Sequence, residues 1–361
     1  MKINSYTKLG LFLSIVSILA GAFVRATGSG DGCGATWPTC KGRIIPGLTD
    51  TSELIEFSHR SVSGLLLIVT LIIFSKTRKF QSGSLVKSVT NYLTFFVIFE
   101  AIIGAVIVLF EWVGLNSSLP RIIAVPIHLV NTFGLLGSYA ILNKILEDDL
   151  RDIKLIFNKS FVLISSLFLL SGATGSITAL ADVLFPSASF IEGFLADFDK
   201  TSDVLTRLRI LHPIISSLLS VILFVYSIRI NKKYGINTKL LQTFVIVAVF
   251  LGVLNVISNI VLPLSILHLA IADFLWISYI YVSIDRETGI IELGRKLKVV
   301  DKVLESHSEI SLDEAKQKDP TVEIGGLIKE ELPPIDFGRI AAQTAKQVIS
   351  VQIRDAERDR Q

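Results

Sequence analysis

The sequence predicts an all-α integral membrane protein, in which eight transmembrane helices form two repeated four-helix bundles, followed by a small soluble C-terminal α+β tail. Three observations predict this fold class. Hydrophobic residues make up 51% of the 361 residues, and the mean hydropathy is +0.61. Eight long apolar segments precede residue 285, and they form two series with the same order of features. This composition excludes a water-soluble globular protein for most of the chain.

Each apolar segment is close to the ~20 residues that a helix needs to cross a bilayer. Runs such as 65–74 and 244–253 are rich in β-branched residues, but lipid offers no partner to an open strand edge, so we predict helices there too. The first segment lacks a signal-peptide cleavage site and is predicted to be retained. We expect helices at approximately 8–26, 57–75, 90–110, 124–142, 155–177, 208–228, 239–260 and 264–283.

The loops predict the orientation in the membrane. Lysine and arginine are concentrated after the second, fourth and sixth segments, whereas the loop after the third has only Arg121 and the loop after the seventh has neither. Basic loops stay on the cytoplasmic side. We therefore predict a multi-pass protein of the cell membrane with both termini in the cytoplasm, and with the odd-numbered loops on the outer side.

Four of the five histidines lie near the start of the even-numbered segments: His59, His128, His212 and His268. With the predicted orientation, all four imidazoles lie in the outer leaflet. Ionisable groups inside a membrane usually mark a function, and neutral imidazole is a common axial ligand of haem iron. A single such histidine could equally be a hydrogen-bonded packing residue. Four in matching positions favour a bundle that holds two haems.

The chain also repeats itself. Segments one to four and five to eight have the same order, and the residues 21–29 are echoed by 172–176. Four helices return the chain to its starting side, so the repeat is parallel. We predict an N-terminal bundle at 1–148 and a C-terminal bundle at 149–284, each with one haem site.

The two halves differ beside their first histidine. A four-helix bundle holds a cofactor between facing helices, so we pair His59 with His128 and His212 with His268. Glu56 precedes His59 by three residues and shares its helix face, whereas Arg209 has this position before His212. This difference favours a reaction site in the first half and an electron carrier in the second. Glu56 could alternatively be an acid that the helix dipole favours.

The two cysteines, Cys33 and Cys40, lie in the first outer loop. They could close a small disulfide ring on the oxidising side or remain free thiols, and they are too few for a typical structural zinc site. Near the same ends lie Arg25, Arg60, Arg207 and Arg209. These could pair with haem propionates or anchor the helices at the interface.

Several motifs resemble the haem A synthase family (the CtaA/Cox15 group). They include Gly21–Arg25, the loop with Cys33, Trp37-Pro38 and Cys40, and Glu56-x-x-His59-Arg60. The similarity extends to His268 and covers about residues 8–284.

This resemblance implies an oxidoreductase that converts haem O to haem A by oxidising the C8 methyl to a formyl group. His59 and His128 would ligate the substrate haem, His212 and His268 would ligate haem b, and Glu56 would assist at the methyl group. Cys33 and Cys40 match a cysteine pair of the family. The implied partners are haem O, a haem O synthase and membrane lipid, with the electron acceptor unassigned.

Two other function classes stay open. A dihaem b-type protein could transfer electrons without changing its haem, and a transporter or assembly factor could use the histidines for structure or for a metal. Glu56 and the cysteine loop favour haem A synthesis over electron transfer. The scarcity of other intramembrane charges disfavours the third class.

Residues 285–361 are charged and have no membrane-length apolar run, so we predict a soluble cytoplasmic tail. Residues 336–360 have the spacing of an amphipathic helix, and His307 is predicted to be solvated. Residues 284–289, 309–315 and 336–349 resemble part of the NusA N-terminal domain. In that family the domain contacts RNA polymerase. We interpret the tail as a gene fusion or an artefact, keep polymerase contact as an alternative, and expect no nucleic acid.

Overall fold

The computed structural model describes residues 3–47, 49–80, 84–148, 159–288, 294–301, 303, 308–318 and 322–331. The chain divides into two compact units. The first comprises residues 1–232 and 236–287, and the second includes residues 288–361. Each unit is described by itself. The predicted helix at 336–360 and His307 lie outside the described residues.

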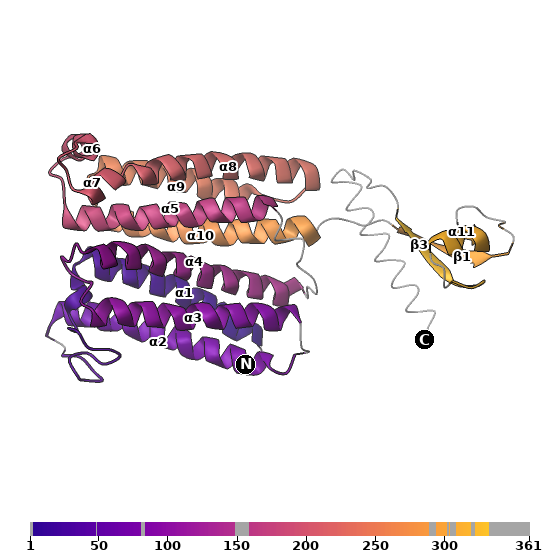
Figure 1. Ribbon diagram of the computed structural model, residues 1–361, viewed down its shortest axis with the longest axis horizontal. Coiled ribbons are helices and arrows are strands. Elements are labelled where there is room, and N and C mark those ends of the chain that lie inside the picture. Colours follow the sequence, from indigo (N-terminus) through magenta and orange to yellow (C-terminus); the bar gives the residue numbers. More distant parts are fainter. Residues whose placement is uncertain are drawn as a thin grey trace. The chain divides into compact units, whose positions relative to one another are not determined.

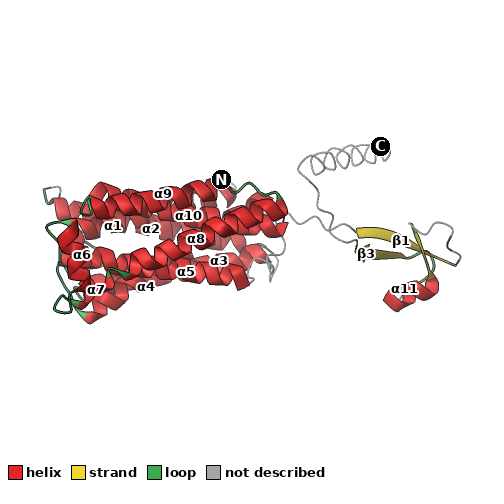
Figure 2. Ribbon diagram, turned by 90° about the horizontal axis from the view of Figure 1, so that it is seen from above, coloured by secondary structure: helices red, strands yellow, loops and turns green. Residues whose placement is uncertain are grey.

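The predicted membrane fold is confirmed, because eight described helices are long and apolar enough to cross a membrane. They run alongside one another in two groups (Figures 1 and 2). Most of them extend beyond the apolar segments of the sequence. The start predicted for the fifth, at 155–158, lies outside the described residues. The long helices are α1 (Ile3–Ala26), α2 (Thr51–Thr77), α3 (Leu85–Leu109), α4 (Leu119–Asp148), α5 (Lys159–Leu184), α8 (Leu211–Tyr234), α9 (Lys239–Ile257) and α10 (Leu262–Thr288).

The first half is a ring of four helices. Helix α1 packs against α2 and α4, and α3 packs against the same two helices, so α2 and α4 face each other across the bundle. Polar bonds join the helices where lipid supplies no partner. Thr7 donates to Asn143 Oδ1 at 2.8 Å, and the hydroxyls of Thr70 and Tyr139 are 2.7 Å apart.

Aromatic rings join the helices of the second half and also join the two halves. The rings of Phe168 on α5 and Trp276 on α10 stack at 4.7 Å. Phe133 on α4 meets Phe168 edge to face at 5.2 Å, and the Trp276 indole N–H donates to the Phe133 carbonyl at 3.0 Å. The halves therefore meet along α4, α5 and α10.

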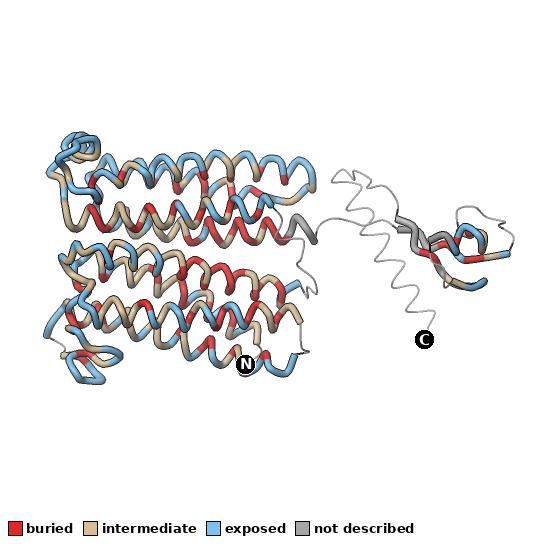
Figure 3. The backbone as a smooth tube through the Cα atoms, viewed as in Figure 1, coloured by how far each residue is buried: buried red, intermediate tan, exposed pale blue. Residues whose placement is uncertain are grey.

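Exposed and buried residues alternate along the helices, as expected for a bundle in lipid (Figure 3). Large apolar side chains such as Phe12, Phe95, Val221 and Phe250 are more than half exposed. Two covers lie at one end of the bundle (Figure 1). The first half has a disulfide loop that contains η1 (Ser29–Asp31), and the second half has the short helices α6 (Phe190–Phe198) and α7 (Val204–Leu208).

The tail contains a three-stranded sheet, and its predicted α+β character is confirmed over the described residues. β1 (Gly294–Val300) is central, parallel to β2 (Glu309–Ser311) and antiparallel to β3 (Leu327–Glu331). Helix α11 (Leu312–Lys318) follows β2. The hydrophobic core of the tail contains Leu297, Val299, Ile310, Ala315 and Ile328.

Candidate functional site

The four membrane histidines lie at matching depths. They belong to α2, α4, α8 and α10, and each lies within ~10 residues, about 15 Å, of the helix start at the end that carries the covers. All four side chains are half-buried. Because α2 and α4 face each other across their bundle, His59 and His128 come from opposed helices, as a cofactor between them requires.

Each imidazole packs against a glycine of the preceding helix. The position of a Cβ on the glycine would lie 2.9–3.8 Å from the imidazole Cε1, and the shorter of these distances leave no room for a side chain. The same contact therefore occurs four times in the bundle. The pairs are Gly21 with His59, Gly104 with His128, Gly175 with His212, and Gly252 with His268.

These contacts refine the repeat that the sequence predicts. Gly175, and not Gly172, matches Gly21, because Gly175 is the glycine that faces a histidine. Gly172 instead packs against the Phe133 ring at the contact between the halves, where an added Cβ would lie 2.9 Å from the ring. An alignment of the two Gly-Ala motifs pairs Gly21 with Gly172. This alignment differs by about one helical turn from the one that the histidine contacts define.

The imidazoles of the second histidine pair lie close to each other. The ring centroids of His212 and His268 are 6.3 Å apart. This separation is close to the sum of two metal–nitrogen bonds of about 2 Å and the radii of two imidazoles. His212 Nδ1 lies 3.1 Å from the Ser171 carbonyl, which can only accept, so Nδ1 carries the proton and Nε2 is free to ligate.

The first pair has a carboxylate beside it that the sequence reasoning missed. Glu100 of α3 places Oε1 3.2 Å from His128 Nδ1. The Glu100 carboxylate accepts from Asn131 Nδ2 and from Thr132 Oγ1, both at 2.5 Å. The available signal was a single acidic residue inside an otherwise apolar segment, which usually marks a function.

The second half has no carboxylate at the matching place. Glu100 precedes Gly104 by four residues, and Ala248 precedes Gly252 by the same interval. The second half does bury Asp273, which follows His268 by five residues and so lies about 140° around the helix. Neither Asp273 oxygen has a hydrogen-bond partner among the described residues.

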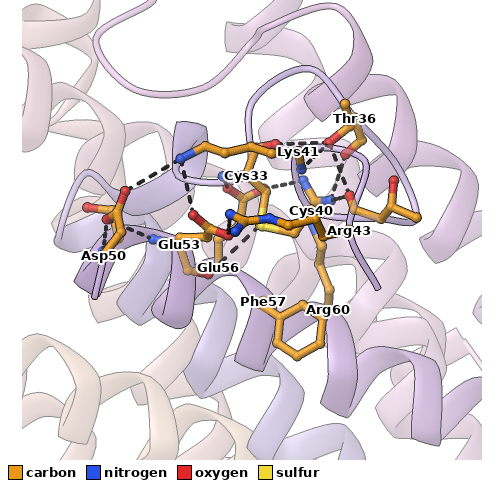
Figure 4. Close-up of a disulfide and its surroundings, with 12 residues drawn as sticks. Cys33, Thr36, Cys40, Lys41, Arg43, Asp50, Glu53, Glu56, Phe57 and Arg60 are labelled. Carbon is orange, nitrogen blue, oxygen red and sulfur yellow. Dashed lines mark hydrogen bonds and ion pairs between the residues drawn. A yellow bond between two sulfur atoms is a disulfide. The ribbon is translucent and has the colours of Figure 1, made fainter. Parts of the chain in front are cut away.

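Glu56 joins the disulfide loop to α2 (Figure 4). Its Oε2 accepts from the Cys33 backbone N–H at 2.7 Å, and its Oε1 forms an ion pair with Arg60 one turn later. Arg60 also donates to the Thr36 and Thr39 carbonyls, at 2.6 and 2.8 Å. Both Glu56 oxygens therefore have partners, and the buried carboxylate holds the loop over the first half.

Cys33 and Cys40 form a disulfide. The sequence left open a disulfide ring or two free thiols, and the structure has the ring. Beside it, buried Glu53 forms ion pairs with Lys41 at 3.2 Å and Arg43 at 2.7 Å. The Glu53 hydrogen bond raises the pKa of Lys41. Asp50 caps α2, and the backbone N–H of Glu53 lowers the pKa of the Asp50 carboxyl.

In the second half, a buried arginine takes the place of the buried glutamate and holds the cover. Arg209, at the position that matches Glu56, is buried and pairs with Asp182 at 3.0 Å and Asp197 at 2.8 Å. It also donates to the Gly193 carbonyl of α6 at 3.2 Å. The pKa of the Asp197 carboxyl is raised, because the effect of burial outweighs the opposite effect of the Arg209 guanidinium.

The arginines therefore differ in what they can offer a bound propionate. Arg60 and Arg209 already pair with carboxylates of the protein. Arg207 is exposed. Arg25 has a buried Nε without a hydrogen-bond partner among the described residues. Of the four, Arg25 is the one that fits a buried anionic group best.

Known proteins match the two units separately. Residues 5–280 match the COX15-CtaA family, which is described as cytochrome oxidase assembly protein. Residues 271–359 match the NusA N-terminal domain. The chain is 34% identical over 300 residues to a protoheme IX farnesyltransferase of Thermus thermophilus, with 79% of this chain and 49% of that protein covered.

Shorter stretches match further relatives. The heme A synthase of Halalkalibacterium halodurans is 39% identical over 109 residues, which are 30% of this chain and 35% of that protein. The transcription termination/antitermination protein NusA of the same species is 48% identical over 77 residues, which are 21% of this chain and 20% of that protein. The chain spans about half the length (49%) of the Thermus proteins that match most of it.

Proposed function

The chain belongs to the COX15-CtaA family, and we propose that it is a haem A synthase, which oxidises the C8 methyl of haem O to a formyl group. The product, haem A, is a prosthetic group for cytochrome oxidase. The family description, cytochrome oxidase assembly protein, and the similarity to the heme A synthase of Halalkalibacterium halodurans support this assignment. The four histidines and their surroundings supply the physical argument.

The difference between the two histidine pairs is the observation that carries the proposal. Both pairs share the same packing against glycine. In the first pair, Glu100 of α3 lies 3.2 Å from His128, and Glu56 lies one turn before His59, whereas the matching places in the second half hold Ala248 and Arg209. A pair of equivalent electron-transfer sites does not require this difference, whereas one reacting haem and one electron carrier do.

In the first half, we assign His59 and His128 as the axial ligands of the substrate haem. A haem held between them would supply the redox chemistry, with the electrons passing to an acceptor outside this chain, and the protein would position the haem and adjust its electronic properties. Glu56 is our candidate for accepting a proton at the reacting methyl group. Its bonds to the Cys33 N–H and Arg60 hold the carboxylate in one orientation beneath the disulfide loop, which also restricts the access of water.

In the second half, we assign His212 and His268 as the ligands of haem b. The 6.3 Å ring separation and the Ser171 carbonyl beside His212 support this assignment. The carbonyl fixes the tautomer and the ring orientation, which is a common arrangement for ligating histidine. We further propose the half boundaries at 148 and 284, because α4 ends at Asp148 and the apolar, membrane-length part of α10 ends at Ile284.

Haem O is a farnesylated haem, so a protohaem farnesyltransferase must supply the substrate. The Thermus relative has this printed name, but this chain spans only half of that protein. We therefore propose such an enzyme as a partner. The basic loops support an orientation with both termini in the cytoplasm and the covers on the outer side.

The test is to express the full chain in a host that lacks haem A, with and without a haem O synthase, and to identify the extracted haems by chromatography and mass. Haem A that forms only with the haem O synthase supports the proposal. Haem b alone, at two per chain, would indicate the dihaem electron-transfer alternative. Haem O formed without the added synthase would indicate farnesyl transfer by this chain.

A further inference from the structure

We propose that Glu100 is a positioning residue, which holds the His128 imidazole in its ligating orientation and sets the first haem site apart from the second. This inference rests on the proposed binding of a haem between His59 and His128. It concerns a residue on a different helix from either ligand. The juxtaposition of Glu100 Oε1 and His128 Nδ1, at 3.2 Å, is the starting point.

The carboxylate itself is held in place by α4. Asn131 and Thr132 follow His128 on α4, and both donate to Glu100 at 2.5 Å. Thr132 Oγ1 also approaches the His128 carbonyl, at 2.7 Å. Asn131 Nδ2 further reaches the Phe96 carbonyl of α3 at 3.0 Å. One helix thus supplies the ligand and the two donors that orient the carboxylate, so a rotation of His128 would disturb the whole group.

A purely structural role accounts poorly for a carboxylate at this place. An ionisable side chain inside a membrane is costly. The second half forms the same glycine contact, Gly252 with His268, with Ala248 at the matching place. The scaffold therefore does not need a carboxylate in order to place an imidazole at this depth.

The chemical consequence follows from the behaviour of ligating histidines. Glu100 Oε1 lies within ion-pair distance of His128 Nδ1 but outside hydrogen-bond alignment. A negative carboxylate this close to Nδ1 favours the tautomer that carries its proton there, orients the ring and raises the basicity of the ligating nitrogen. A more basic ligand beside a negative charge stabilises the oxidised iron. We expect the first site to have a lower midpoint potential than it would have without Glu100.

The experiment uses the full chain in detergent, loaded with haem b as the probe, with Glu100→Gln, Glu100→Ala and Asp273→Asn compared with the wild type. A redox titration followed by absorption reports each site, and His212→Ala identifies the signal of the second. Glu100→Ala should weaken haem retention at the first site by about 10- to 100-fold. Glu100→Gln, which keeps the size but removes the charge, should raise the midpoint potential of the first site.

Asp273→Asn is the matched control, because it removes a buried intramembrane carboxylate that lies on α10, in the second half. It should leave the first site unchanged. Unchanged retention and potential in both Glu100 variants, or equal shifts at both sites, would overturn the proposal. A wild type without haem at the first site would overturn it together with the proposed function. If the first site responds but haem A never forms, the positioning role stands and the proposed synthase activity fails.

Discussion

The two halves share a scaffold and differ in the charges around it. In both, an imidazole packs against a glycine of the preceding helix, and a cover lies over the same end of the bundle. In the first half, α2 contributes an acid, Glu56, which binds the Cys33 backbone N–H and Arg60. In the second half the matching position contributes Arg209, which binds two aspartates. The repeat therefore keeps the position of the imidazoles, and the two halves differ in the charges that surround them.

The largest expected effect separates the halves by their ligands. His59→Ala should abolish haem A formation and leave one haem bound, because the second half keeps both its histidines. His212→Ala should instead remove haem b and leave the first site filled. The extracted haems, identified by mass and counted per chain, check both. Loss of haem b in His59→Ala, with haem O still bound, would reverse the assignment of the halves.

The second prediction tests whether Glu56 acts in the reaction. Glu56→Gln should lower haem A formation by about 100-fold or more, the effect typical of a lost general base. Haem retention should change little. Glu53→Gln is the matched control, since Glu53 is equally buried and also holds the loop, through Lys41 and Arg43. Equal losses in the two variants would show that Glu56 acts only by holding the loop.

The third prediction concerns the cover of the second half. Arg209→Ala leaves Asp182 and Asp197 without their buried counter-charge, which should destabilise this half by about 3–5 kcal/mol. Thermal unfolding followed by release of haem b is the measurement. Arg207→Ala, two residues away and exposed, should have no such effect. Similar melting curves for both variants would contradict the role of Arg209.

The fourth prediction concerns the disulfide, which has no counterpart in the second half. Replacing Cys33 and Cys40 by serine releases a short ring, and should cost about 2–3 kcal/mol. The loss should appear as faster proteolysis of the loop and weaker haem retention at the first site. The haem b signal serves as the internal control, and a parallel loss there would argue against a local role.

The smallest expected effect comes from removing the tail. A chain that ends at Glu287 should form haem A at the rate of the full chain, because the tail is a separate compact unit with its own sheet. Haem content per chain and haem A formed per hour provide the comparison. A clear drop in either would show that the tail takes part in the membrane function.

The sequence predicted the membrane helices well and the two covers poorly. Apolar segments of about 20 residues are a property of local composition, so all eight were identified without tertiary information. The helices α6 and α7 lie in a loop that the sequence reasoning left without structure. The placement of α6 depends on contacts of Asp197 and Gly193 with the buried side chain of Arg209, 12 and 16 residues later in the chain.

The sequence by itself determined the family, the order of the helices, the matching positions of the four histidines in the even-numbered helices and the difference between Glu56 and Arg209. These follow from the periodicity of helices and from residue types along the chain. The tertiary structure decided which residues meet across helices: Glu100 with His128, Gly175 with His212, and Glu56 with the loop. Such contacts depend on the rotation and depth of each helix in the bundle. Packing between helices sets both, and the sequence of one helix alone does not specify them.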